Sequence, residues 1–409
     1  MLSTHNSYHL APSPAINQLL ASPLAQSMLQ PELFLPQSLQ YSHRTLTQQL
    51  DEGVRSLELD VHADPEGGRY AQSAGQRLAG QSGLLDVPAL RQPGFKVFHL
   101  PDFDFNSTCF LLTDCLAEVR RWSEHNPEHL PLVIFIETKQ PDDVTAALGP
   151  DAVATIDAML AASPLPGPDS LTSSLELNAS GLAALEDEIR SVFDAASLLT
   201  PDAVAALLAS TDGTAGLADV AERLLVPPSN ASCPWPDLDT MRGKVLFALL
   251  FGSEEQAAVY EELHPAVSPG TLFWPVSTLG FEAPWPAVFY GSALSLGPNE
   301  AEAAGAPPGG LPANISAYIE EWLEESNQRA SEGYIVRARV DQDTIEARHN
   351  FTARRDALLA TGAQLIQTDY AYHPSTLFPS TYQVTLPGGR PARCINGGSG
   401  SQAPDIACG

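Results

Sequence analysis

The stretch Ser56-Leu57-Glu58-Leu59-Asp60-Val61-His62 sets two carboxylates and an imidazole into an otherwise apolar run. Alternate residues of a β-strand share a face, so Glu58, Asp60 and His62 are expected to point one way and the apolar residues the other. Two neighbouring carboxylates on a buried strand repel each other and lose hydration. A hard divalent cation such as calcium or magnesium would remove both penalties. Taken alone, the stretch also fits a polar strand end in water, and His62 is given no role.

Other short apolar runs follow along the chain, with helical patterns between them. Strands are expected at 56–62, 96–100, 132–138, 244–250, 271–276, 334–340 and 364–369. Helices are expected at 114–122, 154–162, 182–193, 201–209, 315–326 and 344–361. Such alternation is typical of parallel sheets and barrels. With one more strand at the extreme N-terminus the count reaches eight, which predicts an α/β fold, a distorted TIM-like (β/α)8 barrel.

The predicted barrel domain covers residues 1–374. Its alternation is interrupted by the Ala-rich segment 141–239, which we expect to be a helical insertion over one side of the barrel. Residues 375–409 are expected to form a C-terminal loop and a cysteine-containing tail. Only Met1 to Thr4 precede the first polar motif, so the first strand should be a stub with an open seam beside it. We therefore expect the coding sequence upstream of Met1 to supply an apolar strand and a signal peptide.

Composition narrows the classes of function. The chain has 409 residues, of which 44% are hydrophobic and 17% charged, and its formal net charge is -28. A nucleic-acid binder needs a basic stripe, and the sequence has none. The same charge argues against docking on anionic lipid through a polybasic surface. The longest apolar runs, 130–136 and 245–251, are far short of the ~20 residues that a membrane-spanning helix needs. We expect a monomer without a transmembrane segment.

Two features favour a secreted protein. Asn-X-Ser/Thr acceptors are more frequent than chance would place among so few asparagines, and they indicate glycosylation unless the source is bacterial: Asn106, Asn178, Asn230, Asn314 and Asn350. The cysteines can form disulfides, one between Cys394 and Cys408 around the tail and one between Cys109 and Cys115. Cys233 would be left over, and buried or free thiols are the alternative.

Three further motifs carry polar residues at strand ends. They are Thr4-His5-Asn6-Ser7, Phe98-His99-Leu100 and Phe135-Ile136-Glu137-Thr138-Lys139. Each has a structural alternative, which is a loop or cap for the first, a structural histidine for the second and a salt bridge for the third. Together they indicate a site, because each falls at the end of a successive strand candidate. Active sites of barrels are built at the C-terminal ends of the strands.

In their order and spacing these motifs resemble the catalytic X half of the calcium-dependent phosphoinositide phospholipases C. The likeness is closer to the secreted, single-domain microbial members, the calcium-dependent phosphatidylinositol phospholipase C family. It runs over nearly the whole chain and is carried by residues 4–9, 53–60, 99, 126–131, 137, 242–246, 333–343 and 362–370. The resemblance implies a phosphodiesterase that acts at a membrane surface or on micelles. Such an enzyme cleaves phosphatidylinositol-type phospholipids to diacylglycerol and cyclic inositol phosphate.

The resemblance also implies roles for single residues. The positions that match the calcium ligands of the family are Asn6, Glu58, Asp60 and Glu137, and those that match its catalytic pair are His5 and His99. Calcium would lower the pKa of the inositol 2-hydroxyl and offset charge on the phosphorus. One group would remove the hydroxyl proton while a histidine protonates the leaving diacylglycerol oxygen. Which histidine does which stays open. Candidate phosphate or inositol contacts, or else surface salt bridges, are Lys139, Arg337 and Arg339.

Two other functions stay open. A glycerophosphodiester phosphodiesterase shares the barrel, the Glu-X-Asp strand and a second histidine, but its first histidine is usually followed by Arg-Gly, whereas Asn6-Ser7 follows here. A catalytically inactive barrel could serve as a binding protein, and the intact set of histidines, amide and acids argues against that. Calcium-independent bacterial enzymes place an arginine where this chain keeps acids.

Overall fold

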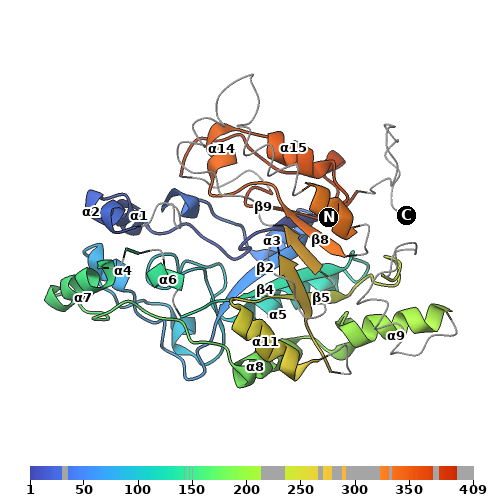
Figure 1. Cartoon of the computed structure of the whole chain (residues 1–409), viewed down its shortest axis with the longest axis horizontal. Coiled ribbons are helices and arrows are strands. Elements are labelled where there is room, and N and C mark those ends of the chain that lie inside the picture. Colours follow the sequence, from blue (N-terminus) through green and yellow to red (C-terminus); the bar gives the residue numbers. More distant parts are fainter. Residues whose placement is uncertain are drawn as a thin grey trace.

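A closed barrel of eight parallel strands forms the centre of the molecule (Figure 1). The computed structural model describes residues 1–29, 36–141, 143–146, 148–149, 151–212, 235–265, 270–278, 288–291, 323–330, 334–371 and 377–393. The barrel strands of this part are β1 (Leu2–Thr4), β2 (Val54–His62), β4 (Leu132–Thr138), β5 (Val245–Leu250), β6 (Trp274–Thr278), β7 (Val288–Gly291), β8 (Ile335–Arg339) and β9 (Leu365–Thr368). Their order is β1-β9-β8-β7-β6-β5-β4-β2, and β1 pairs with β2. The predicted (β/α)8 barrel is confirmed.

One predicted barrel strand was wrong and another was missed. The run 96–100 gives only β3 (Lys96–Val97), which pairs antiparallel with the end of β2. The chain leaves the strand direction there, because Leu100 and Asp104 exchange backbone hydrogen bonds around a turn in which Asp102 has a φ of 66°. The eighth position belongs instead to β7, whose four residues Val-Phe-Tyr-Gly are too short to signal a strand in sequence.

The expected open seam is also wrong. The three residues of β1 pair with both neighbours, Leu2 with Val54 of β2 and with Ile366 of β9. Met1 extends the β9 side, because its carbonyl accepts a hydrogen bond from the Ile366 amide at 2.9 Å. A strand of three residues is therefore enough to close the barrel.

Helices surround the barrel and cover the loops at its edge. They are α1 (Pro14–Leu20), α2 (Pro23–Met28), α3 (Leu46–Asp51), α4 (Ala74–Leu78), α5 (Leu112–His125), α6 (Asp143–Ala146), α7 (Ala152–Ala162), α8 (Ala179–Val192), α9 (Pro201–Asp212), α11 (Glu254–Leu263), α14 (Ile345–His349) and α15 (Ala353–Leu359). Sequence analysis missed α1 and α2, although Ser13-Pro14 and Ser22-Pro23 are typical helix starts. The single helix expected at 344–361 is two, because Asn350 has a φ of 50° and ends α14.

Two apolar layers lie on the two faces of the strands. The inner layer fills the barrel and includes Val133, Phe135, Leu246, Ala248, Trp274 and Val276. The outer layer lies between the strands and helices such as α5 and α8, and includes Leu57, Leu59, Ile134, Phe247, Leu116 and Leu185. The alternation predicted for β2 is therefore confirmed. Its leucines face the helices, and its acids face the interior.

The segment expected as an insertion contains two kinds of helix. Leu182, Leu185 and Ile189 of α8 belong to the same cluster as the outer layer. By contrast, α7 packs beside α4 in a separate small cluster that includes Ile156 and Leu160. Figure 1 shows α1, α2, α4 and α7 gathered at one side of the molecule. The α7 part thus covers loops beyond the barrel, and α8 serves as a barrel helix.

The described part of the C-terminal segment is packed. Tyr382, Val384 and Leu386 are buried in the main cluster, although loop and tail were expected from residue 375 onward. Cys109 and Cys115 form the predicted disulfide. Cys233, Cys394, Cys408, Asn230 and Asn314 lie outside the described residues. Among the described residues, no helix is both long and apolar enough to span a membrane.

The described glycosylation acceptors differ in exposure. Asn178 and Asn350 are exposed, and the hydrogen bonds to their side chains are accepted by the oxygens. Asn106 is half-buried, and its Nδ2 donates to the carbonyl of Ala11 at 2.9 Å. Attachment of a sugar to that nitrogen would break this hydrogen bond. Asn178 and Asn350 are therefore the stronger acceptors.

An ion pair crosses the polar side of the barrel interior. Arg337 Nη2 of β8 donates to Glu58 Oε1 of β2 at 2.7 Å, and neither side chain is exposed beyond 1%. The guanidinium carbon lies 3.8 Å from the ring centre of Phe135 and 4.0 Å from that of Tyr290. Planar guanidinium groups stack on aromatic faces in this way. The two rings and the Glu58 carboxylate together stabilise the guanidinium charge at a position that water does not reach.

We expect Arg337→Met to lower the free energy of unfolding by about 3–5 kcal/mol, because it leaves the Glu58 carboxylate buried without its partner. Urea denaturation followed by circular dichroism measures this. The double variant Glu58→Gln/Arg337→Met should recover part of the loss, since no unpaired charge remains. The partly exposed Arg242, paired with Asp239 at the surface, offers a matched control as Arg242→Met. Equal losses for Arg337→Met and Arg242→Met would contradict the role given to the buried pair.

Candidate functional site

The C-terminal ends of neighbouring strands bring the predicted acidic residues together. Asp60 of β2 pairs in register with Glu137 of β4, so their side chains start from adjacent positions. Asn6 is the second residue beyond the end of β1 and adopts a φ of 43°. Its backbone amide donates to Glu58 Oε2 at 3.1 Å. The four residues expected to bind calcium therefore lie at one end of the barrel, on three strands that are neighbours in the sheet.

Lys139 lies between two of these acids. Its Nζ is 2.7 Å from Asp60 Oδ2 and 2.5 Å from Glu137 Oε1. Asp60 has no exposed surface, while Glu137 is 32% exposed. The sequence left two roles open for Lys139, a contact to phosphate or inositol and a salt bridge. In the structure its ammonium group balances two carboxylates, a task that a divalent cation would otherwise perform.

Burial and charge shift the pKa values of this cluster in different directions. Burial opposes the ionisation of Glu58, but the charges of Arg337 and His5 and the hydrogen bond from Arg337 together outweigh it and lower the pKa. Burial likewise opposes ionisation of Glu137, and Lys139 lowers its pKa. Burial raises the pKa of Asp60 well above its usual value, although Lys139 acts against this. Of these three acids, Asp60 is therefore the one whose ionised form would gain most from an additional positive charge.

The donor atoms fit a hard cation. Asn6 Oδ1 and Asp60 Oδ1 are buried and accept no hydrogen bond of good geometry from the described residues. Buried oxygens without partners are uncommon, and carboxylate and amide oxygens are the ligands that calcium prefers. As the side chains stand, the described residues contain no ready-made group of three or more His, Cys, Asp or Glu for a metal. Lys139 would have to move aside for a cation to reach Asp60 and Glu137.

His5 is held by a carboxylate that the sequence analysis gave no role. Its Nδ1 lies 2.8 Å from Asp369 Oδ1, just beyond the end of β9. Arg339 Nη2 donates to the other oxygen, Asp369 Oδ2, at 3.1 Å, so this expected substrate contact supports the carboxylate instead. The His5 side chain keeps 16% exposure. Burial first, and then the charge of Arg339, lower the pKa of His5 well below its usual range.

His99 is held in the same way by another carboxylate. Its Nδ1 lies 2.7 Å from Asp104 Oδ2, and its side chain is 24% exposed. His9 Nε2 lies 2.9 Å from Asp104 Oδ1, so the buried Asp104 serves two imidazoles. Burial opposes the ionisation of Asp104, but His9 and His99 outweigh it and lower the pKa to about 2.

The rings of Tyr41 and His9 lie in a row between the partly exposed His5 and His99. The Tyr41 ring stacks on His9 with centres 4.2 Å apart, and the centres of His9 and His99 are 6.4 Å apart. On the other side, Tyr41 Oη lies 3.3 Å from His5 Nδ1. The two expected catalytic residues thus belong to one continuous wall, with Tyr41 and His9 in its middle.

Sequence analysis found the histidines and missed their partners. The signal for Asp104 was its spacing of five residues from His99, within the turn that ends β3. Asp369 lies at the end of a predicted strand, which is where barrel residues reach a site. Arg337 was a candidate for a phosphate or inositol contact or else for a surface salt bridge, and in the structure it is fully buried in an ion pair with Glu58. Tyr41 had no signal, because it lies in a loop far from every motif.

A comparison with protein families gives one match, a profile described as "Phosphoinositide phospholipase C, Ca2+-dependent", over residues 1–278 and 314–396. No curated protein matches this chain.

Several solved structures are similar at low identity. A calcium-dependent phosphoinositol-specific phospholipase C from the Gram-negative bacterium Pseudomonas sp. is 15% identical with a TM-score of 0.46, covering 96% of this chain and 93% of that chain. A Ca2+-dependent phosphatidylinositol-specific phospholipase C from Streptomyces antibioticus is 16% identical with a TM-score of 0.38, at 90% and 92% coverage. Membership of a family therefore rests on the family profile.

We expect Asp104→Asn to lose about 2 kcal/mol of folding free energy at neutral pH, because the pKa of Asp104 falls from 3.8 to about 2 on folding. A lowered pKa contributes stability above the unfolded value near 4, and that stability is lost as pH falls toward 2. The difference between wild type and variant should therefore shrink over that window. Urea denaturation at pH 2.5, 4 and 7 measures it. An equal difference at all three pH values would contradict the assignment.

Proposed function

The chain belongs to the calcium-dependent phosphoinositide phospholipase C family, and on that premise we propose that His5 and His99 form the acid–base pair of its phosphodiester cleavage. The observation that carries the proposal is the pairing of each partly exposed histidine with its own carboxylate. The substrate is a phosphatidylinositol-type phospholipid, and the cofactor of the family is calcium.

His5 is suited to accept a proton. Its lowered pKa keeps the ring neutral near pH 7, and its Nδ1 faces Asp369, which leaves Nε2 as the nitrogen for a substrate. When Nε2 takes the proton of the inositol 2-hydroxyl, the imidazolium that forms is stabilised by the Asp369 carboxylate. Arg339 keeps that carboxylate oriented through its own hydrogen bond. His5 is therefore proposed as the general base.

His99 is then proposed as the general acid. The 2-hydroxyl oxygen attacks phosphorus, the bond from phosphorus to the glycerol oxygen breaks, and His99 gives that oxygen a proton. The products are cyclic inositol phosphate and diacylglycerol. The Asp104 carboxylate lies 2.7 Å from Nδ1 of His99, which orients the ring and leaves Nε2 to face the leaving oxygen. Tyr41 and His9 hold the two histidines apart, so that each can serve a different oxygen of one phosphate.

Asn6, Glu58, Asp60 and Glu137 are proposed to hold calcium. When bound, the ion would lower the pKa of the 2-hydroxyl and offset charge on the phosphoryl oxygens. Arg337 keeps Glu58 ionised, which preserves a negative charge for the site. Lys139, once released from Asp60 and Glu137, is within reach of the same region and is proposed to contact the phosphate.

We further propose a secreted monomer. The exposed acceptors Asn178 and Asn350 and the Cys109–Cys115 disulfide support an extracellular protein, because disulfides persist in oxidising compartments. The tail disulfide between Cys394 and Cys408 is part of the same proposal.

Phosphorus NMR of phosphatidylinositol turnover tests the function. We expect cyclic inositol phosphate with calcium and no turnover with excess chelator. Asp60→Asn should weaken both turnover and calcium binding measured by calorimetry, because it removes a charged ligand. The matched control is Glu128→Gln, an exposed acid that precedes β4 at the opposite end of the barrel. Glycerol 3-phosphate as the main product would instead indicate a glycerophosphodiester phosphodiesterase. Full activity in chelator would contradict the calcium site.

The two histidine variants should respond differently to a substrate that carries a good leaving group. His5→Ala and His99→Ala should each lower turnover by roughly a hundredfold or more, with calcium affinity nearly unchanged. A substrate with a good leaving group, such as an inositol nitrophenyl phosphate, needs no proton on that oxygen. It should therefore restore turnover in His99→Ala and leave His5→Ala slow. Rescue of His5→Ala alone would reverse the two roles, and wild-type rates in the double variant would remove both.

A further inference from the structure

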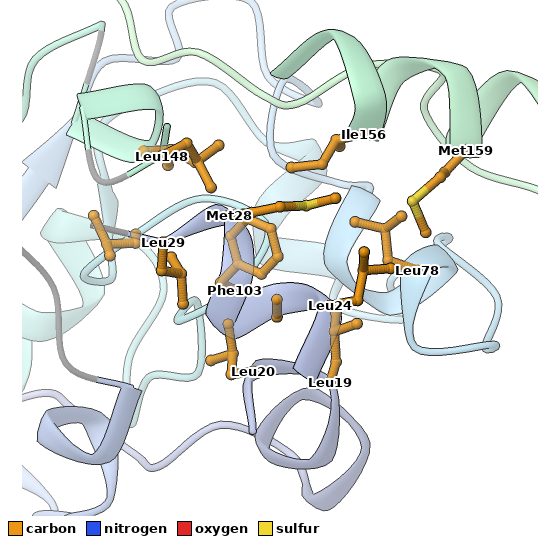
Figure 2. Close-up of a pocket in the computed structure, with 13 residues that line it drawn as sticks. Leu19, Leu20, Leu24, Met28, Leu29, Leu78, Phe103, Leu148, Ile156 and Met159 are labelled. Carbon is orange, nitrogen blue, oxygen red and sulfur yellow. The ribbon is translucent and has the colours of Figure 1, made fainter. Parts of the chain in front are cut away.

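An entirely apolar cavity of about 60 Å³ lies beside the catalytic end of the barrel. Figure 2 shows its walls, with Leu20 and Leu24 in the lower part of the view, Ile156 and Met159 in the upper part, and Met28 and Phe103 between them. These residues come from α1 and α2, from α7 and from the turn after β3. Its lining carries almost no polar surface, so it is unsuited to an ion or a sugar.

The walls of the cavity continue from the segments that carry the catalytic residues. Leu100, which lines it, follows His99 directly, and Phe103 precedes Asp104. The helices α1 and α2 belong to the loop that begins with His5 and Asn6 after β1. Val144 and Leu148 belong to the loop that follows Glu137 and β4. The cavity therefore starts one residue from the proposed general acid.

The cavity opens to the surface. Leu24 and Met159 of its lining are 49% and 36% exposed, and none of the residues of α2 is buried. Its neighbours form two small clusters apart from the main core. Apolar side chains gathered at an opening mark sites where an apolar ligand is bound.

We propose that this cavity binds the part of one acyl chain nearest the glycerol of the phosphatidylinositol substrate. The inference rests on the proposed function, because His99 protonates the glycerol oxygen and the acyl chains therefore leave on its side of the phosphate. The net charge of -28 disfavours a purely electrostatic hold on anionic lipid. An engineered cavity of about 150 Å³ is known to hold benzene. A cavity less than half that size takes a few methylene groups, and the rest of the chain stays at the rim or in the membrane.

The test uses water-soluble phosphatidylinositols with two equal chains of four, six or eight carbons, below their critical micelle concentrations. No membrane is present, so any increase of kcat/KM with chain length must come from contacts between the acyl chain and the protein. Each methylene that enters an apolar site raises binding about fourfold. We expect kcat/KM to rise by about that factor for each methylene that the cavity admits, and then to level off.

Two sets of variants test whether the rise of kcat/KM with chain length depends on the cavity. Ala25→Phe fills the cavity from α2, and Leu24→Gln with Met159→Gln makes its rim polar. Both should reduce the ratio of kcat/KM for the eight-carbon substrate to that for the four-carbon substrate by tenfold or more. Leu263→Gln changes an exposed leucine at the end of α11, outside the cavity, and should keep the wild-type ratio.

Each outcome decides one question. A wild-type ratio near one, or a ratio that both sets of cavity variants leave unchanged, overturns the acyl-chain site while the enzyme still cleaves phosphatidylinositol. Unchanged ratios together with weaker sedimentation on phosphatidylcholine vesicles would assign these residues to membrane docking instead. No cleavage of any of the three substrates with calcium present would overturn the proposed function itself. Reduced ratios in both sets, with Leu263→Gln unaffected, support the site.

Discussion

The carboxylate of Glu58 is the point on which the rest of the site depends. One of its oxygens accepts from Arg337 of β8, and the other accepts from Gln367 of β9 and from the amide of Asn6 after β1. Since β2, β1, β9 and β8 are consecutive neighbours in the barrel, this one side chain ties four strands together. The barrel can close with so short a β1 because these charged hydrogen bonds, roughly twice as strong as neutral ones, add to the backbone ladder. The turn that presents His5 is fixed by the same contacts.

The charged groups at this end of the barrel form two regions, an acidic cluster with one lysine and two histidine–carboxylate pairs. In one region a single ammonium group, that of Lys139, lies between the carboxylates of Asp60 and Glu137, and its movement would open both acids to a cation. The two histidines lie beside this cluster, each restrained by a carboxylate at Nδ1, which fixes the ring and leaves Nε2 for chemistry. Arg339 and His9 are second partners of those carboxylates. These chains of contacts fix the orientation of both imidazole rings.

The sequence predicts local periodicity well and distant pairing poorly. The alternation in 56–62 predicted which residues of β2 face inward, and the apolar run 132–138 predicted β4. The strand at 96–100 failed because a turn at Pro101-Asp102 ends it, and tertiary pairing made a strand of four residues at β7. His5, Asn6, Glu58, Asp60, His99 and Glu137 could be found from motifs. Asp369 could not be assigned, because its meeting with His5 depends on barrel closure across 364 residues. Tyr41 could not be assigned either, because it lies in a loop 36 residues from His5 and outside every motif. The burial of Arg337 was not predicted for a related reason. The strand pattern shows that Arg337 and Arg339 share a face, but it does not show that the Phe135 and Tyr290 rings and the Glu58 carboxylate enclose Arg337.

The joining of β1 to β9 has a consequence for biosynthesis. Because synthesis runs from the N-terminal side, His5 is made 364 residues before Asp369, which holds its ring. Leu2 of β1 is likewise made long before its partner Ile366 of β9. Until then β1 lacks one neighbour and the proposed base lacks its carboxylate. This end of the barrel can therefore assemble only after β9 has been made.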